Sequence, residues 1–409
     1  METQSQVNQE KIEIEGEFGP FQATPIKLDI LPITVFIGPQ GTGKSLVSQF
    51  LYFFRDAEYL LAQLPEREDA NQVVRRIVEG VRGGEKIHKA FAPFLTKDVQ
   101  ITYQFQYHNN HSTQERKIAF HKKDYNINPL QPFRQEIEEW LLRFVKPAMA
   151  GQVLKKALFV PAERTFLSHV INPAPHLLGN NALSIATREF INFLFTEAAN
   201  IHQQWQTEPE QCPKEANDID NLVKEVLGGQ AVFTQNSAYA RKWQYVLNDS
   251  QQSLEIEMAS SGQMDTWPLV SAVQAIFGLK KAHRPLFLHI EEPETHLHPK
   301  AQVALIKMLA YLVNQGFHLV ITTHSLFVLY VLNNLTLAYR QLNYQNAKNV
   351  PEPLVRLPPE KVVAYQFDNG TVTNIVDETG QIDEGLLGNV LGDLEVEFNR
   401  LTAYKILWG

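Results

Sequence analysis

Residues 38–45 read GPQGTGKS, and this stretch decides the expected fold because it is the complete pattern of a phosphate-binding loop. It follows a strand-like apolar run, residues 33–37, and precedes a segment, Ser45 to Phe54, whose apolar residues recur at helical spacing. Glycines let backbone N–H groups turn toward an anion at a helix N-terminus. We expect Lys44 to reach the β- and γ-phosphates and the Ser45 hydroxyl to hold Mg²⁺. The predicted binding residues are Gly38, Pro39, Gln40, Gly41, Thr42, Gly43, Lys44 and Ser45.

A second apolar run, Leu286 to Ile290, ends in the adjacent carboxylates Glu291 and Glu292. Open α/β sheets bind ligands at the carboxyl ends of their strands. We therefore interpret Glu291 as the carboxylate that supports Mg²⁺ and Glu292 as the general base that polarises the attacking water. Aspartate is usual at the first position, and glutamate is longer by one carbon bond, about 1.5 Å, which predicts shifted metal coordination and slow turnover.

Two shorter motifs accompany the acidic pair. Ser260, Ser261, Gly262 and Gln263 could grip the γ-phosphate held by another subunit, or they could simply cap a helix, as SerSerGlyGln often does. The ThrThrHisSer stretch at residues 322–325 ends a strand, where His324 could touch the γ-phosphate or the attacking water. A purely structural role is the common alternative for an isolated histidine.

Composition bounds the class of protein. The chain has 409 residues, of which 44% are apolar and 20% charged, so it can bury a core and is expected to have two lobes. The single cysteine, Cys212, excludes an intramolecular disulfide and fits a cytoplasmic location. Neither a secretory signal nor an apolar run long enough for a membrane span is expected. The net charge of −8 argues against a uniformly basic nucleic-acid-binding surface but leaves a local basic groove open.

Strands that alternate with helices predict an α/β fold with a parallel sheet, namely a P-loop NTPase core. Val99 to Tyr107 and Arg116 to Phe120 predict a small antiparallel β subdomain, and residues 132–257 predict an inserted, mainly helical lobe. The expected units are the N-terminal core with the phosphate loop and β subdomain (1–130), the helical lobe (131–256), the C-terminal core (257–345), and a terminal hairpin with an acidic helical tail (346–409).

Taken in order, GPQGTGKS, SSGQ, EEPETHLHP and TTHS resemble the motifs of the AAA-named, ABC-class ATPases, relatives of the RecF, SMC and overcoming-lysogenisation-defect ATPases. The resemblance covers Lys11 to Leu64 and Glu257 to Asn334, and it excludes the helical lobe. It implies an ABC-type core in which residues 260–263 are a signature loop that acts in trans, Glu292 is the catalytic base and His324 is the switch histidine. Met258 and Ala259 replace the leucine-containing start of that signature. A metal-contacting glutamine is also implied, either Gln104 or Gln106.

The same resemblance implies a homodimer that closes around two ATP molecules and opens after hydrolysis. The leading hypothesis is an ATPase whose cycle drives or gates a DNA-related process, with bacterial antiviral defence as the setting. The alternative is a weakly hydrolysing switch or scaffold that regulates a partner effector such as a nuclease, and the departure at Glu291 motivates it. A small-molecule kinase is a third hypothesis, which leaves the signature and switch motifs without a purpose.

Other residues receive simpler interpretations. His296 and His298 precede Pro299 at a helix start, so a capping or interface role is favoured over metal ligation. Arg164, in ProAlaGluArg, is a candidate dimer or phosphate contact. The basic set is interpreted as a solvated helix face: Arg75, Arg76, Arg82, Lys86 and Lys89. The acids of the tail are interpreted in the same way: Asp383, Asp393, Glu395 and Glu397.

Overall fold

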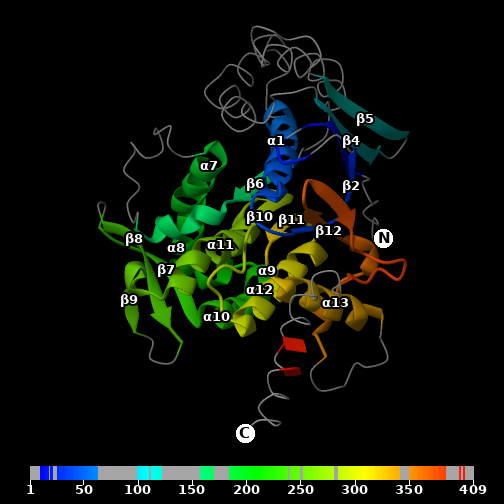
Figure 1. Cartoon of the computed structure of the whole chain (residues 1–409). Helices are drawn as coiled ribbons and strands as arrows, with labels where there is room; N and C mark the ends of the chain where they lie inside the picture. Colours follow the sequence, from blue (N-terminus) through cyan, green and yellow to red (C-terminus); the bar gives the residue numbers. More distant parts are fainter. Residues whose placement is uncertain are drawn as a thin grey trace, which may run out of the picture.

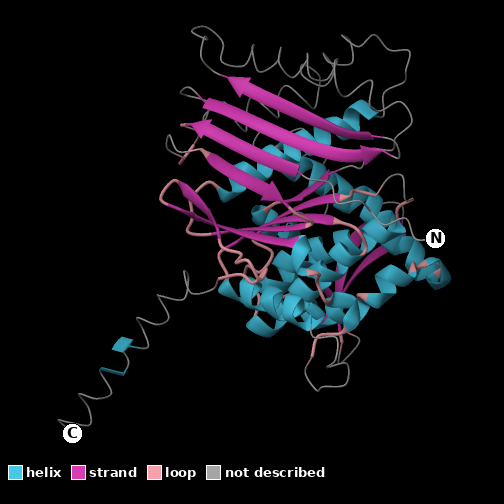
Figure 2. Ribbon diagram, turned by 90° about the vertical axis from the view of Figure 1, so that its right-hand side faces the viewer, coloured by secondary structure: helices cyan, strands magenta, loops and turns pink. Residues whose placement is uncertain are grey.

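The structure, a computed structural model, describes most of the chain. The described residues are 10–17, 19–21, 25–62, 99–109, 112–121, 157–169, 184–237, 240–248, 252–280, 284–340, 350–383, 396–397 and 399–400. A long-stranded sheet lies on one side of the molecule, and most helices gather on the other (Figures 1 and 2). A second sheet runs between these layers (Figure 2).

The central sheet has six strands in the order β13-β12-β3-β11-β10-β6. The five from β12 to β6 are parallel, and β13 closes a terminal hairpin against β12. Every residue of β3 and β10 is buried, as expected for parallel strands covered on both faces. The strands are β3 (Ile33–Ile37), β6 (Ala157–Val160), β10 (Phe287–Glu291), β11 (His318–Thr323), β12 (Val362–Asp368) and β13 (Thr371–Asn374).

These strands confirm the predicted α/β class. Because β3, β11 and β10 are parallel neighbours, their carboxyl ends meet at one edge of the sheet. The phosphate loop follows the end of β3, whereas the 322–325 motif and the acidic pair span the ends of β11 and β10. The helices after these strands are α1 (Lys44–Ala62), α12 (Pro299–Asn314) and α13 (Leu326–Arg340). Gly316, at a φ of 89°, lies just beyond the end of α12.

The predicted antiparallel subdomain is confirmed and is larger than expected. β4 (Val99–Asn109) and β5 (Ser112–His121) form the expected pair, and β4 also pairs with β1 (Glu10–Gly16), which pairs with β2 (Ile26–Ile30). The strand order is therefore β2-β1-β4-β5. The Tyr365 hydroxyl, on β12, donates to the Asp29 carbonyl oxygen at 3.0 Å and ties this sheet to the central one.

The described part of residues 131–256 contains the expected helices together with strands that the sequence did not predict. β6 joins the central sheet, and β7, β8 and β9 form a separate antiparallel sheet. The short run ALFV of β6 is too brief for its periodicity to distinguish strand from helix. The added sheet comprises β7 (Gly229–Ser237), β8 (Ala240–Leu247) and β9 (Ser253–Glu255). The helices here are α7 (Ile185–Phe193), α8 (Ala199–Thr207), α9 (Lys214–Asp218) and α10 (Asp220–Leu227), with a π-helical turn, η4 (Leu194–Ala198), between α7 and α8.

A buried charged chain fixes α1 between the two sheets. Glu10 accepts two hydrogen bonds from Arg55, at 2.9 and 2.6 Å, and Arg55 lies 3.1 Å from His289 Nε2. His289 Nδ1 lies 3.2 Å from the Ser48 hydroxyl. Burial, and then the nearby Arg55, lower the pKa of His289, so the ring is neutral and accepts from the guanidinium. The first turns of α1 are therefore fixed against β10, two residues before the acidic pair.

A second buried histidine predicts a pH dependence of stability. His202, on α8, lies 2.9 Å from the Ser271 carbonyl oxygen, and burial lowers its pKa to about 4. His202 is protonated below about pH 6.5 in the unfolded chain but only below about pH 4 in the folded chain. Between these values the unfolded chain binds more protons, so the free energy of unfolding falls as the pH falls. Between pH 7 and 5 we expect His202→Gln to lose about 2 kcal/mol less unfolding free energy than wild type. Urea unfolding of both proteins at the two pH values measures this, and equal losses would contradict it.

No helix in the described ranges is long and apolar enough to cross a membrane. Of the acidic tail, Asp383 and residues 396–397 and 399–400 are described; Asp383 is exposed outside any helix, and Glu397 is exposed within the helical residues. The acids Asp393 and Glu395 and the basic set at 75–89 lie outside the described residues. The domain boundaries proposed above stay a prediction.

Candidate functional site

The phosphate loop needs its glycines for two physical reasons. Gly38, Gly41 and Gly43 all have positive φ, at 149°, 74° and 96°. A Cβ on Gly38 would lie 2.0 Å from the Phe367 carbonyl oxygen, and one on Gly43 would lie 2.4 Å from the Phe21 ring. The loop is therefore held against β12 and against the segment before β2, with α1 beginning at Lys44.

Lys44 is folded onto its own loop. Its ammonium group donates to the carbonyl oxygens of Gly38 at 2.8 Å and Pro39 at 2.7 Å, and only 5% of the residue is exposed. Burial lowers the pKa of Lys44, and the charges of Glu292 and Glu294 oppose this shift. The lysine thus lies beside two carboxylates of the turn after β10, although the two segments are about 250 residues apart in sequence.

Glu291 ends β10 with its carboxyl group buried. Its Oε2 accepts from the Ala162 backbone N–H at 3.3 Å, and its Oε1 has no hydrogen-bond partner among the described residues. Burial raises the pKa of Glu291, and its interaction with the Ser45 hydroxyl, followed by that with Ala162, opposes the rise. The end of the phosphate loop and the first carboxylate are therefore neighbours.

Glu292 and His324 meet side by side. The Glu292 Oε1 lies 3.1 Å from His324 Nε2, and both side chains are about one-third exposed. Glu292 has a φ of 41°, and its backbone N–H donates to the Thr322 carbonyl oxygen at 2.8 Å. This turn leaves the extended path of β10 and carries the second carboxylate to the end of β11.

Arg164 is wholly buried and holds the acidic turn from behind. Its guanidinium donates to the carbonyl oxygens of Glu291 and Glu292, each at 2.7 Å. It also donates to the carbonyl oxygens of Pro161 at 3.0 Å and Asp265 at 2.8 Å. The Arg164 guanidinium thus donates to backbone carbonyl oxygens of its own chain. The structure therefore does not support the predicted dimer or phosphate contact.

The SerSerGlyGln segment begins α11 (Ser261–Gly278) with a capping box. The Ser260 hydroxyl accepts from the Gln263 backbone N–H, and the Gln263 side chain accepts from the Ser260 backbone N–H at 2.8 Å. A Cβ on Gly262 would lie 2.5 Å from the His296 carbonyl oxygen, so this helix start packs against the turn after the acidic pair. In the described part of the chain, no hydrogen bond joins residues 260–263 to the phosphate loop. The segment therefore caps a helix, which was the structural alternative to phosphate binding. Ser260 and Ser261 are exposed.

The structure places the remaining candidates as follows. His298 caps α12 by accepting from the Lys300 backbone N–H at 3.3 Å, and His296 pairs with the buried Asp265. Within the described ranges, no cluster of three or more histidine, cysteine or acidic residues is arranged to hold a metal. Gln104 and Gln106 lie on β4, but their side chains are outside the described residues.

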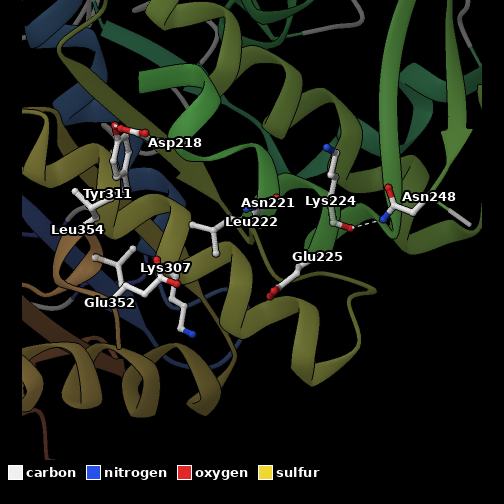
Figure 3. A pocket seen from close by; sticks show the side chains of 11 residues that line it. Asp218, Asn221, Leu222, Lys224, Glu225, Asn248, Lys307, Tyr311, Glu352 and Leu354 are labelled. Carbon is white, nitrogen blue, oxygen red and sulfur yellow. Dashed lines mark hydrogen bonds between the residues drawn. The ribbon is translucent and has the colours of Figure 1, made fainter. Parts of the chain in front are cut away.

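A separate cavity of about 470 Å³ lies between α10 and α12 (Figure 3). In it the Tyr311 hydroxyl donates to Asp218 at 3.0 Å, and burial raises the pKa of Tyr311. The cavity shares no residue with the phosphate loop or the acidic turn, and its lining has both charge signs. Its lining residues are Asp218, Asn221, Leu222, Lys224, Glu225, Asn248, Lys307, Tyr311, Glu352, Leu354 and Val355.

Comparison with known proteins gives one family match. The profile of the family described as "AAA ATPase domain" matches residues 84–329, more than half of the chain. No curated protein matches the sequence. Similar solved structures include an SMC head bound to the C-winged helix domain of ScpA, with 12% identity, a TM-score of 0.42, and coverage of 90% of this chain and 96% of that one. An SMC head with an extended coiled coil bound to the C-terminal domain of ScpA, derived from Pyrococcus furiosus, has 11% identity and a TM-score of 0.42, with coverage of 95% of this chain and 99% of that one. The SMC head domain from Thermotoga maritima has 9% identity and a TM-score of 0.35, with coverage of 90% of this chain and 98% of that one.

Proposed function

The chain belongs to the AAA ATPase domain family, and on this premise we propose that it binds ATP with Mg²⁺, closes as a homodimer around two nucleotides and hydrolyses them. The observation that carries this proposal is the geometry of one sheet edge, where the parallel neighbours β3, β11 and β10 bring the phosphate loop with Ser45, His324 and Glu291 to the same side. A hydroxyl and a carboxylate at the carboxyl edge of a parallel sheet suit a nucleotide and its metal ion.

The residues at this edge fit Mg²⁺. The Glu291 carboxyl is buried, and its Oε1 has no hydrogen-bond partner among the described residues, which leaves an oxygen donor for a hard cation. Ser45 and Glu291 would hold the ion, which would neutralise charge on the β- and γ-phosphates. The loop N–H groups and the Lys44 ammonium would bind the same phosphates, after Lys44 releases the Gly38 and Pro39 carbonyl oxygens.

Glu292 and His324 are placed to act on water. With His324 Nε2 3.1 Å from its Oε1, Glu292 can accept the proton of a water molecule that attacks the γ-phosphorus. Thr295 holds the same residue, because its hydroxyl donates to the Glu292 carbonyl oxygen at 3.0 Å. His324 would orient the water or the γ-phosphate, and the fixed backbone of the turn would keep the base in position.

A dimer would complete the site. Ser261 is exposed at the start of α11, and the neighbouring Met258 is 71% exposed, so this helix start is open to a second copy of the chain. The exposed hydroxyl and backbone N–H of Ser261 could bind the γ-phosphate on the facing protomer, at the positive end of the helix dipole. A two-fold dimer would then use the same pair of surfaces twice.

The dimer is tested in the Glu292→Gln background, in which ATP should persist. We expect the particle mass from light scattering to double at saturating MgATP, and Ser261→Arg to restore the monomer because the long side chain blocks the interface. Ser253→Arg, the same change at an exposed serine on β9, is the matched control and should still dimerise. A monomer at saturating ATP without Ser261→Arg would refute the dimer.

Glu291 favours one alternative, a weakly hydrolysing switch that regulates a partner effector. Glu291 stands where aspartate is usual, and its side chain is longer by one carbon bond, about 1.5 Å, so the buried carboxylate would hold the cation in a shifted position. Near-background phosphate release together with ATP-dependent assembly would favour the switch. Glu291→Asp, which has the shorter side chain, distinguishes the two functions further, because faster turnover would identify side-chain length as the cause of slow hydrolysis.

The process that the cycle serves is proposed from the sequence resemblance alone. We retain a DNA-related or antiviral defence process, with a partner effector, as the leading setting. ATP turnover that rises when double-stranded DNA is added would support a DNA-driven motor. Turnover that ignores DNA but changes with a co-purifying protein would support the regulated switch instead.

A further inference from the structure

Glu294 is a buried carboxylate in the turn after the acidic pair, and the roles proposed so far do not use it. The residue is 7% exposed. Its Oε1 accepts from the Thr323 hydroxyl and, at 3.0 Å, from the His324 backbone N–H. Its Oε2 is buried and has no hydrogen-bond partner among the described residues. A carboxylate buried in this way is costly unless its bonds to neighbours offset the loss of water.

The bonds made by Glu294 lie just beyond the last backbone pairing between β10 and β11. The parallel register ends where Glu291 faces Thr322, and the Glu292 N–H donates to Thr322 at 2.8 Å. Beyond this point β10 and β11 have no further backbone pairing. The Glu294 carboxylate bridges them instead, by binding two successive residues at the end of β11.

The segment tied to Glu294 is the one that carries His324. Thr323 passes the link on, because its hydroxyl oxygen accepts from the Ser325 backbone N–H at 2.9 Å. Hydrogen bonds therefore connect residues 323–325 to one carboxylate oxygen, the Glu294 Oε1. From that backbone His324 extends its Nε2 to the Glu292 Oε1, 3.1 Å away. The path from Glu294 to Glu292 thus runs through His324, although the two glutamates are only two residues apart in sequence.

We propose that Glu294 is a positioning residue for ATP hydrolysis, which fixes the His324 backbone so that the imidazole meets Glu292 and the attacking water. The inference rests on the proposed function and adds a residue that acts through His324. Because Glu294 touches His324 and not the phosphates, its loss should lower kcat and leave nucleotide affinity unchanged.

The test is a double-mutant cycle on the full-length chain, with phosphate release measured at saturating MgATP. We expect Glu294→Ala to lower kcat about 10- to 100-fold, the scale of a misplaced catalytic group, with the ATP dissociation constant unchanged within about threefold. Glu294→Gln keeps an acceptor oxygen and should restore most of the rate. In a His324→Ala background, Glu294→Ala should change kcat by less than about twofold, because its effect runs through the missing ring.

Thr323→Val gives a second measurement if Glu294→Ala does not fold. It removes one donor to Glu294 at nearly constant volume, and we expect a smaller loss of kcat that again vanishes in the His324→Ala background. Glu352→Gln, at an exposed position away from the site, is the control for a lost carboxylate.

The outcomes separate this inference from the proposed function. Equal losses from Glu294→Ala with and without His324 would show a merely structural role and overturn the inference. A wild-type chain that hydrolyses ATP and keeps its full kcat after Glu294→Ala would overturn the inference alone. A wild-type chain with no ATP turnover under any condition would overturn the proposed function and the inference with it.

Discussion

Glu292→Gln should bind MgATP as tightly as wild type and release phosphate about 10² to 10⁴ times more slowly, the usual contribution of a general base. Glutamine has nearly the shape of glutamate but cannot accept a proton from water. The contacts around the residue predict that the turn survives, because Arg164 and the Thr295 hydroxyl both bind the Glu292 carbonyl oxygen, which the substitution does not touch. The positive φ of 41° is equally accessible to either side chain.

Two measurements separate chemistry from binding in this variant. Titration of a fluorescent ATP analogue reports affinity, and single-turnover phosphate release reports the chemical step. Glu360→Gln changes an exposed glutamate in the short helix η10 (Pro359–Lys361) and should match wild type in both. Undiminished turnover in Glu292→Gln would remove this residue from the mechanism. Weakened binding would instead identify it as a residue that supports the loop.

The local parts of the fold could be predicted because each carries its own signal. The phosphate-loop pattern, the buried run of β3 and the helical spacing after Ser45 occupy one continuous stretch, so neighbouring residues alone specify strand, loop and helix. The same holds for β10, β11 and α12, which end in a carboxylate, a polar turn and a glycine. Parallel neighbours then bring the motifs to one edge, as the α/β class requires.

Long-range pairings and short strands could not be predicted in this way. β12 pairs in parallel with β3, about 330 residues before it, and no local pattern encodes that choice of partner. Strand β8 was missed although Trp243 and Tyr245 are buried and Gln244 is less so, which is the alternation of a half-buried strand. The signal that predicts this strand is the period-two alternation of apolar and polar residues at positions 243–245.

The candidate site shows the same limit at the level of single side chains. The motifs identified Glu291, Glu292 and His324, but not the residues that hold them. In the sequence Arg164 is only a charge in ProAlaGluArg that suggests a dimer or phosphate contact, whereas its four backbone acceptors come from segments up to 128 residues away. In the sequence Glu294 is one of three glutamates within residues 291–294, and nothing in the sequence distinguishes it from the other two. Only the folded contact with Thr323 and His324 distinguishes it from a solvated acid.

Removal of the phosphate-loop lysine should have the second large effect. Lys44→Ala should weaken MgATP binding by about 10²-fold or more, since it removes a charge-assisted bond to the β- and γ-phosphates in a largely buried position. Without the lysine, no cation offsets the negative charges of Glu292 and Glu294 near the anionic phosphates. Their repulsion should weaken ATP binding further. Hydrolysis should fall with binding. Isothermal titration with MgATP measures the affinity directly.

The nucleotide-free fold should tolerate this change. Lys44 donates to the carbonyl oxygens of Gly38 and Pro39, and the Thr42 hydroxyl also donates to Pro39 at 2.8 Å, so one of the two acceptors keeps a partner. Thermal unfolding without ATP should therefore change little, whereas the stabilisation that ATP gives to wild type should disappear. Lys361→Ala removes a lysine remote from the loop and should keep that stabilisation in full. If Lys44→Ala still bound and was stabilised by ATP like wild type, the loop of residues 38–45 would not be the nucleotide site.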